Sequence, residues 1–136
     1  MILADTSAWV EYDRATGSVA EQRLRSLIDS DGPLAVTEPV MMEIMAGARS
    51  ERRASELRRL LLRFELMSFD AVADFEAAAH IYRTCRGAGT TPRGMIACMI
   101  AATAWRRAAS VLSHDADLAR VAQVIGLELD HGSLRP

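Results

Sequence analysis

The sequence contains no lysine: all 16 basic side chains other than histidine are arginines. This absence excludes a P-loop nucleotide site, because that motif places a lysine against the phosphates. Receiver domains and haloacid-dehalogenase-like phosphotransferases also carry acidic groups at strand ends, but both need a lysine that this chain does not have. The absence of lysine therefore excludes all three of these phosphate-binding or phosphate-transfer classes.

Cysteine is almost as scarce. Cys85 and Cys98 are the only two and show no metal-ligand spacing, so we expect reduced thiols in a cytoplasmic protein, with a Cys85–Cys98 disulfide as the alternative. No apolar run approaches the ~20 residues that span a bilayer. No basic segment precedes an apolar stretch near the start, so neither a membrane association nor a signal peptide is expected.

The chain of 136 residues is half hydrophobic and one quarter charged, which is typical of one globular domain covering residues 1–136. Short apolar runs alternate with amphipathic helical patterns. This alternation predicts an α/β fold, a parallel sheet of about five strands sandwiched by helices. The predicted strands are residues 1–4, 34–36, 66–69, 111–112 and 127–129.

Carboxylates follow several of these strands. Asp5 comes directly after the first strand, Glu43 lies in the helix after the second, and Asp115 and Asp117 follow the fourth. Since parallel strands end at one edge of a sheet, we expect all four side chains to meet there. Gathered carboxylates either take up protons or bind a divalent cation. Considered singly, Asp5 could be a helix cap or part of a turn, and Glu43 and Asp117 could be solvated.

Four segments together resemble the PIN-domain ribonucleases, and in particular the VapC toxins of bacterial VapBC toxin–antitoxin modules. These segments are Asp5-Thr6-Ser7-Ala8-Trp9, Val40–Gly47 with Glu43 inside it, Met99–Ala104, and Leu112–Leu118 with Asp115 and Asp117. The resemblance covers the whole chain and implies a PIN-like domain with Mg²⁺- or Mn²⁺-dependent endoribonuclease activity on tRNA or ribosomal RNA. It also implies a cognate VapB-type antitoxin and a homodimer.

The resemblance assigns roles to the acidic set. Asp5, Asp115 and Glu43 become the predicted metal ligands, and Asp117 joins them as a catalytic carboxylate that completes or orients a second, weaker site. The sequence is compatible with a site for one metal ion or for two. The hydroxyls of Thr6 and Ser113 stand beside the ligands and are predicted to orient them, as groups around metal ligands do.

One position departs from the family pattern. An aspartate normally stands three residues before Ile100, and this chain has Ala97 there. Because one ligand and one negative charge are missing, we expect poor metal binding and slow or absent cleavage. The alanine is either a natural loss or a replacement that disarms a toxin.

RNA binding requires cations, and the net charge of −2 speaks against a general nucleic-acid binder. However, residues 49–63 hold six arginines against two glutamates. We predict RNA contacts from this segment and from the arginines around a Gly-containing loop, with a solvated helix face as the alternative. The predicted RNA-binding residues are Arg49, Arg52, Arg53, Arg59, Arg86 and Arg93.

Other interpretations stay open. His114 neighbours Asp115 but should point to the other side of an extended segment, as a surface or packing residue. A non-catalytic PIN-like module that only binds an antitoxin would explain Ala97. A PIN nuclease of RNA maturation would share the acidic set without being a toxin.

Overall fold

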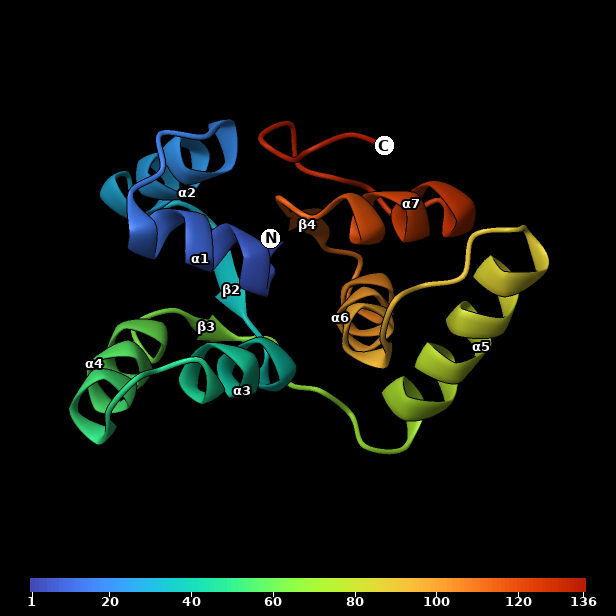
Figure 1. The fold of residues 1–136 in the computed structure, drawn as a ribbon, viewed down its shortest axis with the longest axis horizontal. Helices are drawn as coiled ribbons and strands as arrows, with labels where there is room; N and C mark the ends of the chain where they lie inside the picture. Colours follow the sequence, from blue (N-terminus) through green and yellow to red (C-terminus); the bar gives the residue numbers. More distant parts are fainter.

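Four short parallel strands form the centre of the computed structural model, which covers residues 1–136 (Figure 1). They are β1 (Ile2–Ala4), β2 (Leu34–Val36), β3 (Glu65–Leu66) and β4 (Ser110–Leu112). The strand order is β3-β2-β1-β4, and Leu3 lies opposite Ala35 on one side and Val111 on the other. Because β1 is central, its carboxyl end has a neighbouring strand end on each side.

Every residue of β1 and β2 is buried, as expected for a parallel sheet that is covered on both faces. The seven helices provide the cover. They are α1 (Thr6–Arg14), α2 (Val19–Asp29), α3 (Glu38–Ala46), α4 (Glu51–Leu61), α5 (Ala73–Gly87), α6 (Met95–Arg106) and α7 (Ala116–Ile125). Figure 1 shows three groups around the strands: α1 with α2, α3 with α4, and α6 between α5 and α7.

The predicted sheet was slightly too large. The expected strand at 127–129 is reduced to one bridge between Leu129 and Val111. The Asp130 N–H still donates to the Val111 carbonyl, while the Asp130 side chain pairs with Arg23. The expected strand at 66–69 ends early, because the carboxylate of Glu38 accepts hydrogen bonds from Ser68 and from the Phe69 N–H. At residues 68–69, hydrogen bonds to a side chain thus stand where sheet pairing was expected.

Helix starts follow the sequence signals. Ser18 caps α2 and Ser50 caps α4, each accepting a backbone N–H three residues later. Asp5 caps α1, one of the roles considered for it from the sequence, and its carboxylate accepts the Ala8 N–H. Asp115 caps α7 in the same way. Two carboxylates are thus held at helix N-termini directly after β1 and β4.

The two cysteines are free and buried, so the alternative of a Cys85–Cys98 disulfide is not realised. None of the seven helices combines the length and the apolar character that a bilayer crossing requires.

Candidate active site

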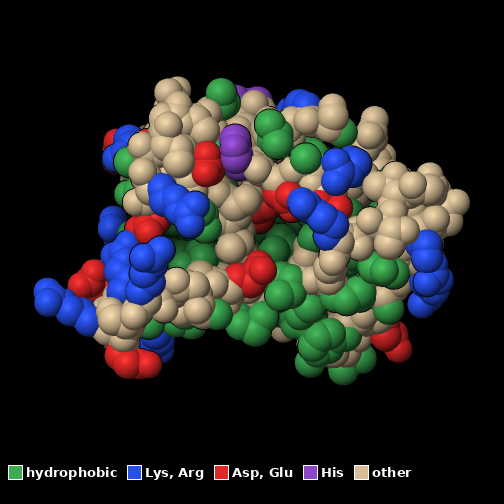
Figure 2. Space-filling view, viewed as in Figure 1, with side chains coloured by type: hydrophobic (Ala, Val, Ile, Leu, Met, Phe, Trp, Pro, Cys, Tyr) green, Lys and Arg blue, Asp and Glu red, His purple; other side chains and the backbone are tan.

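A cavity of about 400 Å³ opens beyond the carboxyl ends of β1 and β4. Carboxylates from separate parts of the chain line it: Asp5 follows β1, Glu11 lies on α1, Glu43 lies on α3 and Asp115 follows β4. Figure 2 shows acidic side chains in a hollow near the middle of this face, with basic side chains beside them. The structure therefore brings together three of the four predicted acidic residues. The full lining is Asp5, Thr6, Ser7, Val10, Glu11, Glu43, Ala97, Ile100, His114, Asp115 and Leu118.

Asp5 is the most enclosed of these carboxylates, with 4% of the residue exposed. Its Oδ1 accepts hydrogen bonds from the Ser7 hydroxyl at 2.6 Å and the Ala8 N–H at 3.0 Å. The Ser113 hydroxyl donates to Oδ2 at 2.6 Å. Burial raises the pKa of Asp5 from 3.8 to about 6, the three donors oppose that rise, and the charge of Asp115 adds to it.

Hydroxyl groups hold the other carboxylates in place. Thr6 donates to Glu43 Oε1 at 2.5 Å, so α1 fixes a side chain of α3. The Asp115 N–H donates to the Ser113 hydroxyl at 3.1 Å, which ties Asp115 to the same serine that contacts Asp5. Of the two hydroxyls that were predicted to orient ligands, that of Thr6 contacts the Glu43 carboxylate. That of Ser113 contacts the Asp5 carboxylate and the Asp115 backbone.

Asp117 lies apart from the cavity. It is buried, and its Oδ2 accepts the backbone N–H of Arg93 at 3.1 Å. Arg120 approaches its other oxygen at 3.5 Å. Asp117 stands two residues beyond Asp115 in the first turn of α7, so it faces the loop before α6 instead of the cavity. Asp117 is not among the residues that line the cavity, although the same Arg93 guanidinium reaches both Asp115 and Asp117.

His114 was expected to point away from the acidic site, but it lies in the wall of the cavity. The chain turns into α7 right after β4, so the alternation of an extended segment does not continue. The His114 N–H donates to the Ser7 hydroxyl at 2.7 Å, and Nε2 lies 3.4 Å from Glu11 Oε1. Sequence reasoning missed Glu11, although its spacing of four from Ser7 places the two on one face of α1.

The pKa of Glu11 lies below its ordinary value. Burial acts to raise it, but hydrogen bonds from Thr16 and Ser18 and the charges of His114 and Arg14 outweigh that effect. Glu11 therefore remains ionised near neutral pH and adds to the negative charge at the mouth of the cavity.

Ala97 also lines the cavity, one helical turn before Ala101 on α6. A methyl group stands where a longer side chain would extend into the space between the carboxylates. No three His, Cys, Asp or Glu side chains are arranged tightly enough here to hold a metal ion. The donor set of carboxylates and hydroxyls nevertheless has the chemistry that hard divalent ions require, and the vacant volume lies beside Ala97.

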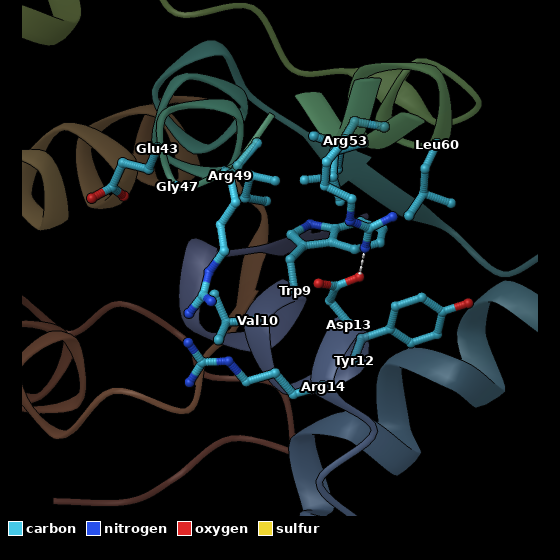
Figure 3. A pocket seen from close by; sticks show the side chains of 14 residues that line it. Trp9, Val10, Tyr12, Asp13, Arg14, Glu43, Gly47, Arg49, Arg53 and Leu60 are labelled. Carbon is cyan, nitrogen blue, oxygen red and sulfur yellow. Dashed lines mark hydrogen bonds and ion pairs between the residues drawn. The ribbon is translucent and has the colours of Figure 1, made fainter. Parts of the chain in front are cut away.

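A second cavity of about 410 Å³ lies between α1, α3 and α4 and shares Val10 and Glu43 with the first. Figure 3 shows Arg14 and Arg49 reaching toward the same end of it beside Val10, while Arg53 pairs with Asp13 across the Trp9 ring. The indole N–H of Trp9 is buried without a hydrogen-bond partner. Fourteen residues line this groove, eight of them hydrophobic, so it combines an apolar floor with a basic rim.

The six predicted RNA-binding arginines divide into two sets. Arg49 and Arg53 line the groove, and Arg93 contacts Asp115 at 3.0 Å. The other three lie outside both cavities: Arg52 pairs with Glu56, Arg59 is exposed on α4, and Arg86 lies over the Tyr82 ring. Figure 2 shows basic side chains gathered over the α4 side of this face.

Comparison with known proteins agrees with this geometry. The family model of the PIN domain matches residues 2–124. Ribonuclease VapC11 of Mycobacterium tuberculosis is 43% identical over 129 residues, which cover 94% of this chain and 96% of that protein. The VapBC2 complex from Rickettsia felis, crystallised on a DNA fragment of its promoter, contains a chain of the same fold with a TM-score of 0.74 at 17% identity, covering 96% of this chain and 98% of that one. VapC20 of M. tuberculosis, a sarcin–ricin loop cleaving toxin, matches over both full chains with a TM-score of 0.70 at 17% identity.

The fold and the acidic edge of the sheet define a PIN-domain protein. Sequence identity over almost the whole length narrows this assignment, and the chain belongs to the VapC ribonuclease family.

Proposed function

We propose that this protein is a divalent-metal-dependent endoribonuclease toxin of a VapBC module, with RNA cleavage at the cavity beyond β1 and β4. One observation carries the proposal. Carboxylates from three distant segments, Asp5, Glu43 and Asp115, line one cavity, and Ala97 lies in the same wall. A cavity lined by four carboxylates, with no arginine among its lining residues, favours a cation over an anionic small molecule.

Asp5 and Asp115 are the proposed direct ligands, and Glu43 completes the set. A bound Mg²⁺ or Mn²⁺ would polarise the phosphodiester and lower the pKa of an attacking water. The hydroxyls of Ser7 and Ser113 fix both oxygens of Asp5, so its carboxylate is oriented before any ion arrives. Thr6 does the same for Glu43. Asp117 acts on the loop before α6 and supports the site from outside.

RNA would approach across the groove that joins the cavity at Val10 and Glu43. Arg14, Arg49 and Arg53 line this groove, and arginine is suited to phosphate because its planar fork donates two parallel hydrogen bonds. The proposed substrate class is structured RNA, either tRNA or ribosomal RNA. Sarcin–ricin loop cleavage by VapC20 is a precedent within the same fold.

The proposed protein partner is a VapB-type antitoxin, since relatives of the same fold are found in VapBC complexes. We also propose a homodimer in the cytoplasm. Exposed Met42 on α3 and Val72 and Phe75 at the start of α5 supply apolar surface for subunit contact. The free thiols of Cys85 and Cys98 are consistent with a reducing compartment.

The decisive experiment restores the missing carboxylate. Ala97→Asp should bind Mn²⁺ at least tenfold more tightly by isothermal titration, because it adds a charge and a ligand in the cavity wall. It should also cleave total tRNA. Ala97→Asn is the matched control, since it adds the same volume without the charge, and it should leave both properties near those of the present chain.

Ala97 itself favours one alternative, a PIN-like module that binds an antitoxin without cutting RNA. Equal Mn²⁺ binding by the present chain and Ala97→Asp, with no cleavage by either, would favour that module. A nuclease of RNA maturation would instead cleave on restoration of the aspartate but would not arrest growth when expressed, and no antitoxin gene would neighbour its own.

A further inference from the structure

Arg93 is the only arginine that forms an ion pair with a carboxylate lining the cavity. Its Nη2 lies 3.0 Å from Asp115 Oδ1, and its Nε lies 4.0 Å from Asp117 Oδ1. Asp5, Glu43 and Glu11 have no arginine partner. The structure thus places one guanidinium on a proposed metal ligand, at the mouth of a cavity that would take a cation.

The backbone of Arg93 is anchored to the fold, while its side chain is largely exposed to solvent. The buried carboxylate of Asp117 accepts the Arg93 N–H at 3.1 Å, which anchors the loop just before α6. The Arg93 side chain is 73% exposed, and that of Asp115 is 32% exposed. An ion pair this exposed is weak, with a contribution of about 0.2–1 kcal/mol.

Both carboxylate oxygens of Asp115 also accept backbone hydrogen bonds from the first turn of α7. Oδ1 accepts the Asp117 N–H at 3.2 Å, and Oδ2 accepts the Leu118 N–H at 3.4 Å. These bonds cap α7 and do not involve Arg93. Displacement of the guanidinium therefore leaves the carboxylate in place, and a divalent ion can take the position that the arginine gives up.

We propose that Arg93 is an exchangeable internal cation of the site. It neutralises Asp115 while the site is free of metal, leaves when a divalent ion binds, and then presents its guanidinium to an RNA phosphate at the mouth of the cavity. This inference rests on the proposed metal-dependent function and adds a positioning residue to it. Asp117, by holding the Arg93 backbone, sets where the guanidinium can reach in both states.

The proposal predicts effects of opposite sign from one substitution. Arg93→Gln removes a competitor for Asp115, so Mn²⁺ should bind about 1.5- to 5-fold more tightly, the range that corresponds to an exposed ion pair. The same substitution should weaken RNA binding when metal is present. A residue with only a structural role would not improve one property while reducing the other.

The first measurement is isothermal titration with Mn²⁺ on the present chain and on Ala97→Asp, each with and without Arg93→Gln. Arg107→Gln is the matched control: Arg107 is exposed at the far end of α6, makes no ion pair, and loses the same charge. Tighter binding with Arg93→Gln and unchanged binding with Arg107→Gln supports the proposal. Equal binding by both variants overturns it while leaving the metal site intact, and no binding by any chain overturns the metal site as well.

The second measurement is the salt dependence of binding to a fluorescein-labelled tRNA transcript by the present chain. In Mn²⁺, Arg93→Gln should reduce the slope of log affinity against log salt by about one, the value for one phosphate contact. In EDTA the slope should not change, because Arg93 is then held by Asp115. An equal change in both conditions would show that Arg93 never exchanges, and that result would overturn the proposal.

Discussion

Two buried aspartates of this protein are held in contrasting ways. Asp74 on α5 is fully buried, and Arg106 on α6 grips both of its oxygens at 2.8 Å. Thr103 and the Asp70 N–H complete its hydrogen bonds. Although burial opposes it, this set of donors lowers the pKa of Asp74. Asp5 is nearly as buried but receives only hydroxyls and one backbone N–H, and its pKa rises to about 6.

The difference separates a carboxylate that serves the fold from one that is available for chemistry. Asp74 joins α5 to α6, and its charge is neutralised within the chain. Asp5 is hydrogen-bonded at both oxygens, which fixes its orientation but leaves its negative charge uncompensated. A group with a strongly shifted pKa in a cavity is a typical sign of a functional site. An external cation would supply for Asp5 what Arg106 supplies for Asp74.

The largest effect on stability should come from the neutralised pair. Arg106→Gln leaves Asp74 buried and unpaired, so the free energy of unfolding should fall by about 3 kcal/mol. Urea denaturation measures this change. Asp74→Asn combined with Arg106→Gln should recover much of the loss, because no buried charge then remains. A loss below ~1 kcal/mol for Arg106→Gln, equal to that of Arg107→Gln, would show that the pair does not stabilise the fold.

Asp5→Asn should raise the free energy of unfolding, whereas Arg106→Gln lowers it. The folded carboxyl has a pKa of about 6 against 3.8 when exposed, so near neutral pH its ionisation opposes folding by up to about 3 kcal/mol. We expect the metal-free Asn variant to be more stable by about 1–2 kcal/mol at pH 7.5, since the amide keeps only part of the hydrogen bonding.

The sign of the pH dependence follows from the direction of the shift. Between about pH 4 and pH 6 the folded state holds a proton on Asp5 that the unfolded state has released, so this contribution to stability falls as pH rises through that window. It levels off above the window and is absent in Asp5→Asn. Parallel curves of unfolding free energy against pH for the two chains would contradict the uncompensated charge.

Features that depend only on neighbouring residues in the sequence could be predicted well. β2 has the predicted limits, and serine, a preferred N-cap residue, precedes α2 at Ser18 and α4 at Ser50. The short strand 127–129 was predicted from the alternation of Leu127 and Leu129, which does not show that the Asp130 side chain pairs with Arg23, more than a hundred residues away in the chain.

The site shows the same limit. Strand position alone places Asp5 and Asp115 at one edge, because parallel strands end together. Position does not decide the side-chain direction after a strand turns into a helix. His114 was therefore expected to point away from the cavity that it lines, and Asp117, which accepts the Arg93 N–H, is not among the lining residues. The groove of Trp9 and Arg49 is built from three helices, and no local pattern in the sequence marks it.

A smaller effect should follow from the hydroxyls that orient Asp5. Ser113→Ala removes the donor to Asp5 Oδ2 and the acceptor of the Asp115 N–H, so stability near neutral pH should fall by about 1–2 kcal/mol. The loss should be smaller below about pH 3, where the carboxyl is protonated in both the folded and the unfolded state. Ser110→Ala, on β4 without a side-chain hydrogen bond, is the control. Equal urea midpoints for the two variants at pH 7.5 would contradict this role.

The smallest changes in stability should come from the arginines of the groove. The contrast between a paired and an unpaired charge appears here for positive side chains, as it did for the negative Asp74 and Asp5. Arg53 is paired with Asp13 and Glu56, whereas Arg49 lines the same groove with no ion pair. Neither Arg49→Gln nor Arg52→Gln should change the unfolding free energy by more than ~0.5 kcal/mol.

Their effects on RNA should nevertheless differ. Arg49→Gln removes a free cation beside the acidic cavity, so the salt slope of tRNA binding should fall by about one. Arg53→Gln should reduce it less, since two carboxylates already neutralise that guanidinium, and Arg52→Gln, outside the groove, should leave it unchanged. Fluorescence anisotropy across a salt series distinguishes the three. Equal slopes for Arg49→Gln and Arg52→Gln would move the RNA path away from the groove.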